Sequence, residues 1–155
     1  MMEASNKAFH LLSLALHQVK ANVRKENDMT EWYSKLNRPP LTPPNWVFSP
    51  VWTVLYITIA ISIFLYYRSS PKSHVGWTSA VLAVHLVTNL LWTYLFFGLH
   101  SPAMALTDIV VLDISLVVLI CWFWESSMLA GALLFPYLAW VLFATYLNYG
   151  FYRLN

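Results

Sequence analysis

The chain carries very few charged residues for its length. Asp, Glu, Lys and Arg make up 10% of its 155 residues, where a soluble domain has about 25%. Hydrophobic residues reach 59%, and the mean hydropathy is +0.56. So few charges could not cover a water-soluble domain of this size, and so apolar a chain is not disordered. The composition therefore indicates an integral membrane protein whose first partner is the lipid bilayer.

Other features are scarce as well. Cys121 is the single cysteine, which excludes a disulfide framework and a thiolate metal site. The net charge of +2 gives no case for nucleic acid as a partner. The chain has no glycine-rich phosphate loop, no HExxH and no GxSxG motif. We therefore expect no catalytic residue, no metal and no required cofactor, and we favour binding over an enzyme activity, which stays open.

Four long apolar stretches can each cross a bilayer as a helix, since about 20 apolar residues span about 30 Å of hydrocarbon. They cover residues 46–67, 77–99, 103–124 and 129–152. The breaks between them are short and hold Pro, Ser or charged residues, as links between antiparallel helices do. The sequence thus predicts an all-α membrane protein with a single transmembrane domain (1–155).

A further segment, about residues 7–23, is a weaker candidate. Its apolar residues recur at helical spacing, but His10, His17 and Lys20 interrupt them. It is either a first span held by contacts with the other helices or an amphipathic helix in the membrane interface. In both cases most basic residues share a side with the following loop, 24–45. The positive-inside rule then places that loop and the C-terminus in the cytoplasm.

Residues 31–46 form a proline-rich segment, EWYSKLNRPPLTPPNW, with four prolines in six residues. Proline restricts the backbone to extended or turn geometry, so the segment is stiff. It is either a surface linker with interfacial Trp and Tyr anchors or a rigid lid over the helix bundle.

Polar residues inside the spans need a reason, because they are expensive in lipid. Each apolar stretch carries a stripe of aromatic or polar residues, in most cases both, at helical spacing. Such stripes suggest an enclosed, mostly apolar pocket with a few orienting polar groups. The stripe residues are Trp52 and Tyr56; His85, Asn89, Trp92 and Phe96; Met104, Thr107, Asp108, Val111 and Ser115; and Trp140, Phe143, Ala144, Leu147 and Asn148.

Asp113 stands apart, at the centre of its span. A carboxylate there costs about 2.5–3.5 kcal/mol on the insertion scale. We expect it to be protonated, to be paired with a polar neighbour such as His85, or to be buried in a contact between subunits. Together with Asp108 and His85 it leaves open a proton- or ion-conducting transporter.

Several motifs follow one another in a distinctive order from about Glu31 to the end of the chain. They are WY at 32–33, RP at 38–39, TPPNW at 42–46, PVWTVLY at 50–56, NLLW at 89–92, FFG at 96–98, ALTD at 105–108, PYLAW at 136–140 and FATYLNY at 143–149. Together they resemble the translocator protein (TspO/MBR) family, also called tryptophan-rich sensory proteins or peripheral-type benzodiazepine receptors.

The resemblance implies a five-transmembrane-helix bundle with a proline-rich capping loop between helices 1 and 2, and commonly a homodimer. It implies a receptor, sensor or carrier for porphyrins, haem precursors, sterols or benzodiazepine-type ligands, in a bacterial membrane or the mitochondrial outer membrane. Joined with the stripes, it yields the ligand-binding candidates Trp52, Tyr56, Asn89, Trp92, Met104, Thr107, Asp108, Val111, Trp140, Phe143, Ala144, Leu147 and Asn148.

Two details qualify the resemblance. The family usually has Trp at the position of Leu41, and in bacterial relatives that Trp is tied to light-dependent porphyrin breakdown. Leu41 therefore weakens the alternative of a porphyrin photo-oxidising enzyme. Leu147, Tyr149 and Arg153 match a weak sterol pattern, which an interfacial tyrosine belt would also produce.

Overall fold

The computed structural model describes Leu14 and residues 17–20, 31–70 and 72–155 of the chain, which divides into the units 1–36 and 37–155. The described parts of the first unit are helical at Leu14, at 17–20 and at 31–35. The first span predicted at about residues 7–23 falls largely outside the described residues. Within the described ranges every regular element is a helix, as predicted.

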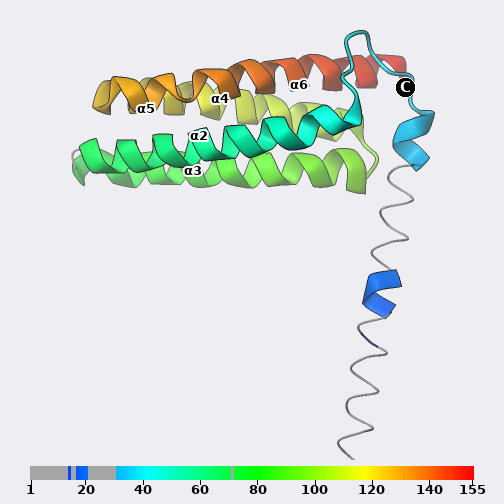
Figure 1. Cartoon of the computed structure of the whole chain (residues 1–155), viewed down its shortest axis with the longest axis horizontal. Helices are drawn as coiled ribbons and strands as arrows, with labels where there is room; N and C mark the ends of the chain where they lie inside the picture. Colours follow the sequence, from blue (N-terminus) through cyan, green and yellow to red (C-terminus); the bar gives the residue numbers. More distant parts are fainter. Residues whose placement is uncertain (1–13, 15–16, 21–30, 71) are drawn as a thin grey trace, which may run out of the picture. The chain divides into compact units, whose positions relative to one another are not determined.

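The described part of the second unit contains four long helical rods, and they lie side by side (Figure 1). Its elements are η1 (Asn45–Val47), α2 (Phe48–Ser69), α3 (Lys72–Thr93), the π-helical turn η2 (Tyr94–Gly98), α4 (Pro102–Ser126), α5 (Met128–Ala132) and α6 (Phe135–Leu154). The rods Asn45–Ser69, Val75–Gly98, Pro102–Ser126 and Met128–Leu154 are long and apolar enough to cross a membrane. The described residues thus hold four spans rather than the five predicted.

Local sequence explains where two of these helices begin. The Ser101 hydroxyl accepts a hydrogen bond from the Met104 amide at 3.3 Å, and Pro102 occupies the first turn of α4. The Ser127 hydroxyl accepts from the Ala130 amide at 3.4 Å at the start of α5. Serine caps satisfy amides that have no partner inside the helix, and proline tolerates the first turn because it has no amide hydrogen.

Helix α4 packs against α3, α5 and α6, and it is the most buried of the four spans. Most of its buried apolar residues are three or four positions apart, which is the spacing of one helix face. They are Ala105, Ile109, Leu112, Leu116, Leu119, Ile120 and Phe123.

Helix α2 packs on α5, where the Ser62 hydroxyl donates to the Ala130 carbonyl at 2.6 Å. Tyrosine side chains link α2 to α3, since the Tyr66 hydroxyl donates to Thr78 Oγ1 at 2.7 Å. The Tyr66 ring also stacks on Phe123 of α4, with centroids 4.2 Å apart. Polar bonds between membrane helices contribute about 0.6 kcal/mol each, so ring packing and these bonds together hold α2 in place.

The last rod is interrupted between α5 and α6. Pro136 has no amide hydrogen, so it cannot make the helical bond to the residue four positions before it. Just before this proline, the Leu134 backbone amide donates to the Gly131 carbonyl at 3.1 Å, three positions back rather than the four of an α-helix. A Cβ added at Gly131 would lie 2.9 Å from Trp124 Cα, so only glycine lets α5 approach α4 this closely.

The proline-rich loop makes a tight turn at residues 39–42. The Thr42 amide and hydroxyl both donate to the Pro39 carbonyl, at 3.4 and 2.7 Å. Pro40 and Leu41 occupy the two central positions, and Leu41 has a φ of 67°. This is the pattern of a turn that favours glycine at its second central position, so Leu41 is held in a strained conformation.

The same loop lies against the C-terminal half of α6 (Figure 1). Pro39 is buried, and a Cβ added at Gly150 would lie 2.9 Å from its Cγ and closer still to its Cβ. The Tyr146 hydroxyl donates to the Pro40 carbonyl at 3.4 Å. Gly150 therefore provides the space in which the proline ring sits.

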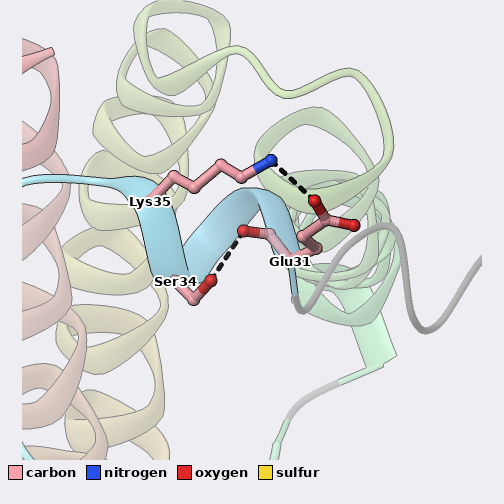
Figure 2. A network of polar contacts seen from close by, with 3 residues as sticks. All are labelled: Glu31, Ser34 and Lys35. Carbon is pink, nitrogen blue, oxygen red and sulfur yellow. Dashed lines mark hydrogen bonds and ion pairs between the residues drawn. The ribbon is translucent and has the colours of Figure 1, made fainter.

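In the first unit, residues 31–35 form a short exposed helical turn (Figure 2). The Lys35 ammonium contacts Glu31 Oε1 at 2.7 Å, and the Ser34 hydroxyl donates to the Glu31 carbonyl at 2.7 Å. The hydrogen bond and positive charge of Lys35 lower the pKa of the Glu31 carboxyl from its ordinary value.

Candidate functional site

Aromatic rings of α2 and α6 meet near the start of α2. Trp52 stacks on Tyr56 with centroids 5.3 Å apart, and its ring also meets Tyr137 edge-on at 6.2 Å. Trp140 follows Tyr137 by one turn of α6 and meets Phe48 edge-on at 5.9 Å. Such offset and edge-on pairs contribute about 0.5–1.5 kcal/mol beyond burial, so the rings hold one another in place.

Asn89 of α3 brings an amide to these rings. The Tyr56 hydroxyl donates to Asn89 Oδ1 at 3.2 Å, and Asn89 Nδ2 donates to the Tyr137 hydroxyl at 2.9 Å. One amide thus joins three membrane helices. We call Trp52, Tyr56, Asn89, Tyr137 and Trp140 the aromatic–amide cluster.

His85 lies one turn before Asn89 and is only 2% exposed. Its Nε2 lies 3.1 Å from the Tyr137 hydroxyl, and its Nδ1 lies 2.9 Å from the Ser115 hydroxyl of α4. The imidazole therefore connects the cluster to α4, and both of its nitrogens have a partner.

The cluster offers ring faces and polar groups to a ligand. Tyr56 is 48% exposed, and Trp52, Asn89 and Trp140 are half-buried, so none of these four is fully enclosed by the described residues. Flat rings stack on indole and phenol faces, and a fixed amide can orient a ligand by one or two hydrogen bonds. The arrangement is suited to a flat, largely apolar molecule with a small polar edge.

Two predicted site residues are used for packing between helices. Trp92 Nε1 donates to Asn148 Oδ1 at 2.8 Å, and Asn148 Nδ2 donates to the Pro102 carbonyl at 2.7 Å. Asn148 is 1% exposed. Both polar ends of its amide are thus occupied in joining α3, α6 and the start of α4.

The predicted residues of α4 do not join the cluster. Met104, Thr107 and Val111 are exposed, and the Thr107 hydroxyl donates to the Ala103 carbonyl of its own helix. Asp108 is buried, and its Oδ2 has no hydrogen-bond partner in the described part of the chain. On α6, the half-buried Phe143 ring lies 5.7 Å from the Trp140 ring, measured between centroids. Ala144, which is half-buried, and Leu147, which is 6% exposed, pack in the bundle core instead.

Asp113 has a polar neighbour, but this neighbour is Thr145 rather than His85. The Thr145 hydroxyl donates to Asp113 Oδ2 at 2.8 Å, while Asp113 Oδ1 is buried without a partner among the described residues. No bond in the described part of the chain joins Asp108, Asp113 and His85 into one relay. The described residues also contain no group of three His, Cys, Asp or Glu that could hold a metal.

The weak sterol motif is not gathered on one surface. Leu147 is 6% exposed in the core, whereas Tyr149 is 48% exposed. Residues two positions apart lie on opposite sides of a helix, which accounts for this separation. Arg153 Nη1 donates to the Tyr149 hydroxyl at 3.3 Å, as one turn of helix allows.

The predicted stripes did not include Tyr137, which belongs to the aromatic–amide cluster and precedes Trp140 by one turn. A stripe that begins at Trp140 leaves out the tyrosine that touches Trp52, Asn89 and His85. Extending each stripe by one turn in both directions would have included it.

Four apolar helices in the described part of the chain, three of which carry the aromatic–amide cluster, define a multi-pass integral membrane protein. The model of the TspO/MBR family matches residues 9–153, and the chain belongs to this family. It is 41% identical over 124 residues to the tryptophan-rich protein TspO of Archaeoglobus fulgidus, which covers 80% of each chain. It is 35% identical over 130 residues to the translocator protein of Homo sapiens, covering 80% of this chain and 75% of that one. Protein CrtK of Rhodobacter capsulatus is 36% identical over 125 residues, covering 80% and 78%.

The resemblance predicted from the motifs is therefore confirmed. The family and the names of its members, among them tryptophan-rich sensory protein and translocator protein, support a membrane receptor or sensor.

Proposed function

We propose that this protein is a membrane receptor, sensor or carrier that binds a flat polycyclic molecule on the aromatic–amide cluster. A porphyrin is the first candidate and a sterol the second. The observation that carries the proposal is the Asn89 amide, which is fixed at both ends by tyrosine hydroxyls between aromatic residues. A fixed polar group among ring faces is what a binding site for a flat apolar ligand requires.

The choice of a porphyrin over a sterol rests on the rings. Trp52 and Trp140 are both half-buried, so each keeps part of its indole exposed. A macrocycle can stack on an indole face, whereas a saturated sterol gains only contact area. A sterol should therefore bind more weakly to the cluster than a porphyrin of similar size.

Titration of the purified protein with protoporphyrin, followed by quenching of tryptophan fluorescence, tests the proposal. We expect saturable binding, and we expect Trp140→Ala to raise the Kd about tenfold, because one ring contact is worth about 1.4 kcal/mol. Trp77→Ala is the matched control, since Trp77 is 78% exposed and lies twelve residues before Asn89 on α3. Non-saturable quenching, or equal losses in both variants, would refute the proposal.

Light-dependent oxidation of the bound porphyrin is the alternative function. Trp140 in the cluster favours it, and Leu41 counts against it because an isobutyl group cannot take part in photo-oxidation as an indole can. Leu41 is 78% exposed, so Leu41→Trp can be made without disturbing the core. Illumination in air should bleach the Soret band at the rate of free porphyrin in the natural chain and faster in Leu41→Trp. A natural chain that bleaches the porphyrin no faster than free porphyrin excludes the alternative, whereas an unchanged rate in Leu41→Trp would show that the missing indole is not the reason.

A further inference from the structure

Asp113 lies deep in its span, far from any basic side chain of the four helical rods. It follows Pro102 by eleven residues and is therefore about 16 Å from the start of α4. The chain has no Lys or Arg between residues 73 and 152, so basic side chains occur only near the ends of these rods, at Arg68 and Arg153. Among the residues that the structure describes, none forms an ion pair with Asp113.

The elements packed on α4 supply no balancing charge either. Helix α3 brings His85, whose two ring nitrogens already have hydroxyl partners. Helix α6 brings Tyr137, which is close enough to Asp113 for an electrostatic interaction, α2 brings Tyr66, and η2 brings the exposed Tyr94. Helix α5 has no titratable residue. The other titratable residues of α4 itself are not basic; they are Asp108, Cys121 and Glu125.

A neutral carboxyl is the form of Asp113 that this environment favours. An ionised carboxylate has about four acceptor sites, and here a single described donor, the Thr145 hydroxyl, fills one of them. The other oxygen, Oδ1, is buried and has no partner among the described residues. An isolated charge is so unfavourable away from water that a buried carboxylate takes up a proton instead.

The Thr145 hydroxyl shows which oxygen of Asp113 carries that proton. Its single hydrogen has two oxygens within reach, Asp113 Oδ2 at 2.8 Å and the Val141 carbonyl at 3.0 Å. The Val141 carbonyl already accepts the Thr145 amide, as α-helical bonding requires, so the hydroxyl hydrogen goes to Oδ2. Oδ2 is then the carbonyl oxygen of the neutral acid, and the proton is on Oδ1.

The carboxyl lies at the edge of the contact between α4 and α6. Asp113 is half-buried, and Val110 and Val117, which lie about one turn before and after it on α4, are exposed. An apolar surface therefore borders the carboxyl, and a small apolar molecule dissolved in the membrane can approach it from that side.

We propose that Asp113 is a proton-binding site within the membrane domain, open to the lipid-facing side of α4. It holds one proton on Oδ1, and Thr145 is the positioning residue that fixes the carboxyl. No hydrogen bond leads on from Oδ1 in the described part of the chain, so the proton is bound at the contact between α4 and α6 and is not passed along it. The inference is independent of the proposed function, because neither residue belongs to the aromatic–amide cluster.

Infrared spectroscopy of the full chain in lipid bilayers tests the protonation. With 13C-labelled aspartate carboxyls, we expect a C=O band of a protonated acid at neutral pH that is lost in Asp113→Asn and kept in Asp108→Asn. Thr145→Val should move this band to higher frequency, because the carbonyl oxygen loses its hydrogen bond. Thr58→Val is the matched control and should leave the band in place, since its hydroxyl donates to the Leu55 carbonyl of its own helix.

Two spectroscopic results would overturn the inference. Loss of a carboxylate band alone in Asp113→Asn would show that Asp113 is ionised, and an unshifted band in Thr145→Val would remove the role of Thr145. If Asp113→Asn does not fold, the shift in Thr145→Val identifies the band and carries the test.

Dicyclohexylcarbodiimide, an apolar reagent for protonated carboxyls, tests access from the membrane. The Asp113 proton moves to one nitrogen of the reagent while the carboxyl oxygen bonds to its central carbon. The adduct rearranges to an N-acylurea, so the whole reagent adds and nothing leaves. Mass spectrometry of the natural chain should find the adduct at Asp113 and not at Glu125, which is exposed in the last turn of α4, and its yield should fall as the pH rises. Modification of Glu125 alone, or of neither residue, would overturn the inference.

Discussion

Asn37 and Asn155 hold each other by reciprocal hydrogen bonds although 118 residues separate them. The backbone N–H of Asn37 donates to Asn155 Oδ1 at 2.9 Å, and Asn155 Nδ2 donates to the backbone carbonyl of Asn37 at 3.2 Å. The Asn37 side chain adds a bond to the Leu154 carbonyl at 3.2 Å. These contacts tie the proline-rich loop to the end of α6.

Asn155→Ala should loosen this attachment. It removes both bonds to the Asn37 backbone, each worth about 0.5–1.5 kcal/mol, so hydrogen exchange of the Asn37 amide should speed up about tenfold. Asn45→Ala, which changes an exposed asparagine at the other end of the loop, should leave that amide unchanged. Unaltered protection of Asn37 in Asn155→Ala would show that the bonds do not hold the loop.

Gly150→Ala should destabilise the protein. The new methyl group would overlap the Pro39 ring, and such overpacking costs about 1–3 kcal/mol of the free energy of unfolding. Gly76→Ala is the matched control, because a Cβ at Gly76 meets nothing within 4 Å and alanine favours a helix by up to about 1 kcal/mol. In unfolding by a denaturing detergent, the midpoint should fall below that of the natural chain for Gly150→Ala and rise above it for Gly76→Ala. An unchanged midpoint for Gly150→Ala would contradict the contact with Pro39.

Thr145→Val should destabilise the bundle by about 1–3 kcal/mol, since it leaves the Asp113 carboxyl without its hydroxyl donor. Thr58→Val makes the same change at another half-buried threonine, whose hydroxyl, among the described residues, donates to the Leu55 carbonyl of its own helix. We expect a lower midpoint of thermal unfolding for Thr145→Val alone. Equal midpoints would mean that Asp113 finds another partner.

Lys35→Ala should raise the pKa of Glu31 toward its ordinary value, because the ammonium that lowers it is removed. A carboxyl with a lowered pKa contributes stability above its unfolded pKa and loses it as the pH falls through the folded pKa. The turn at 31–35 should therefore weaken in acid in the natural chain and respond less in Lys35→Ala. The 13C shift of the Glu31 carboxyl against pH measures both effects, and added salt should reduce them.

The predicted orientation of the spans in the membrane can be tested by labelling with a thiol reagent. In a chain with Cys121→Ala, a cysteine at Leu154 should react with an impermeant thiol reagent from the cytoplasmic side, and one at Ser69 from the opposite side. Both positions are exposed at the ends of their helices. Labelling of intact cells and of inverted vesicles distinguishes the sides, and the reversed pattern would contradict the positive-inside assignment.

The aromatic–amide cluster was predictable in part. Trp52, Tyr56, Asn89 and Trp140 follow from stripes of aromatic and polar residues, because helical spacing shows which residues share a face. Trp92 and Asn148 satisfied the same rule, yet their polar groups bond each other and the start of α4. Spacing identifies a face, but it does not say whether a neighbouring helix or a ligand covers that face.

The sequence by itself determined that this protein lies in a membrane, that its spans are helical and that it resembles the TspO/MBR family. Those conclusions depend on composition, on the length of apolar runs and on motifs, all of which are local properties. The tertiary structure decided the partners: Tyr137 and His85 with Asn89, Thr145 with Asp113, and the proline-rich loop with α6. These pairings join residues far apart in the chain, and only the packing of one helix on another brings their atoms within hydrogen-bonding distance.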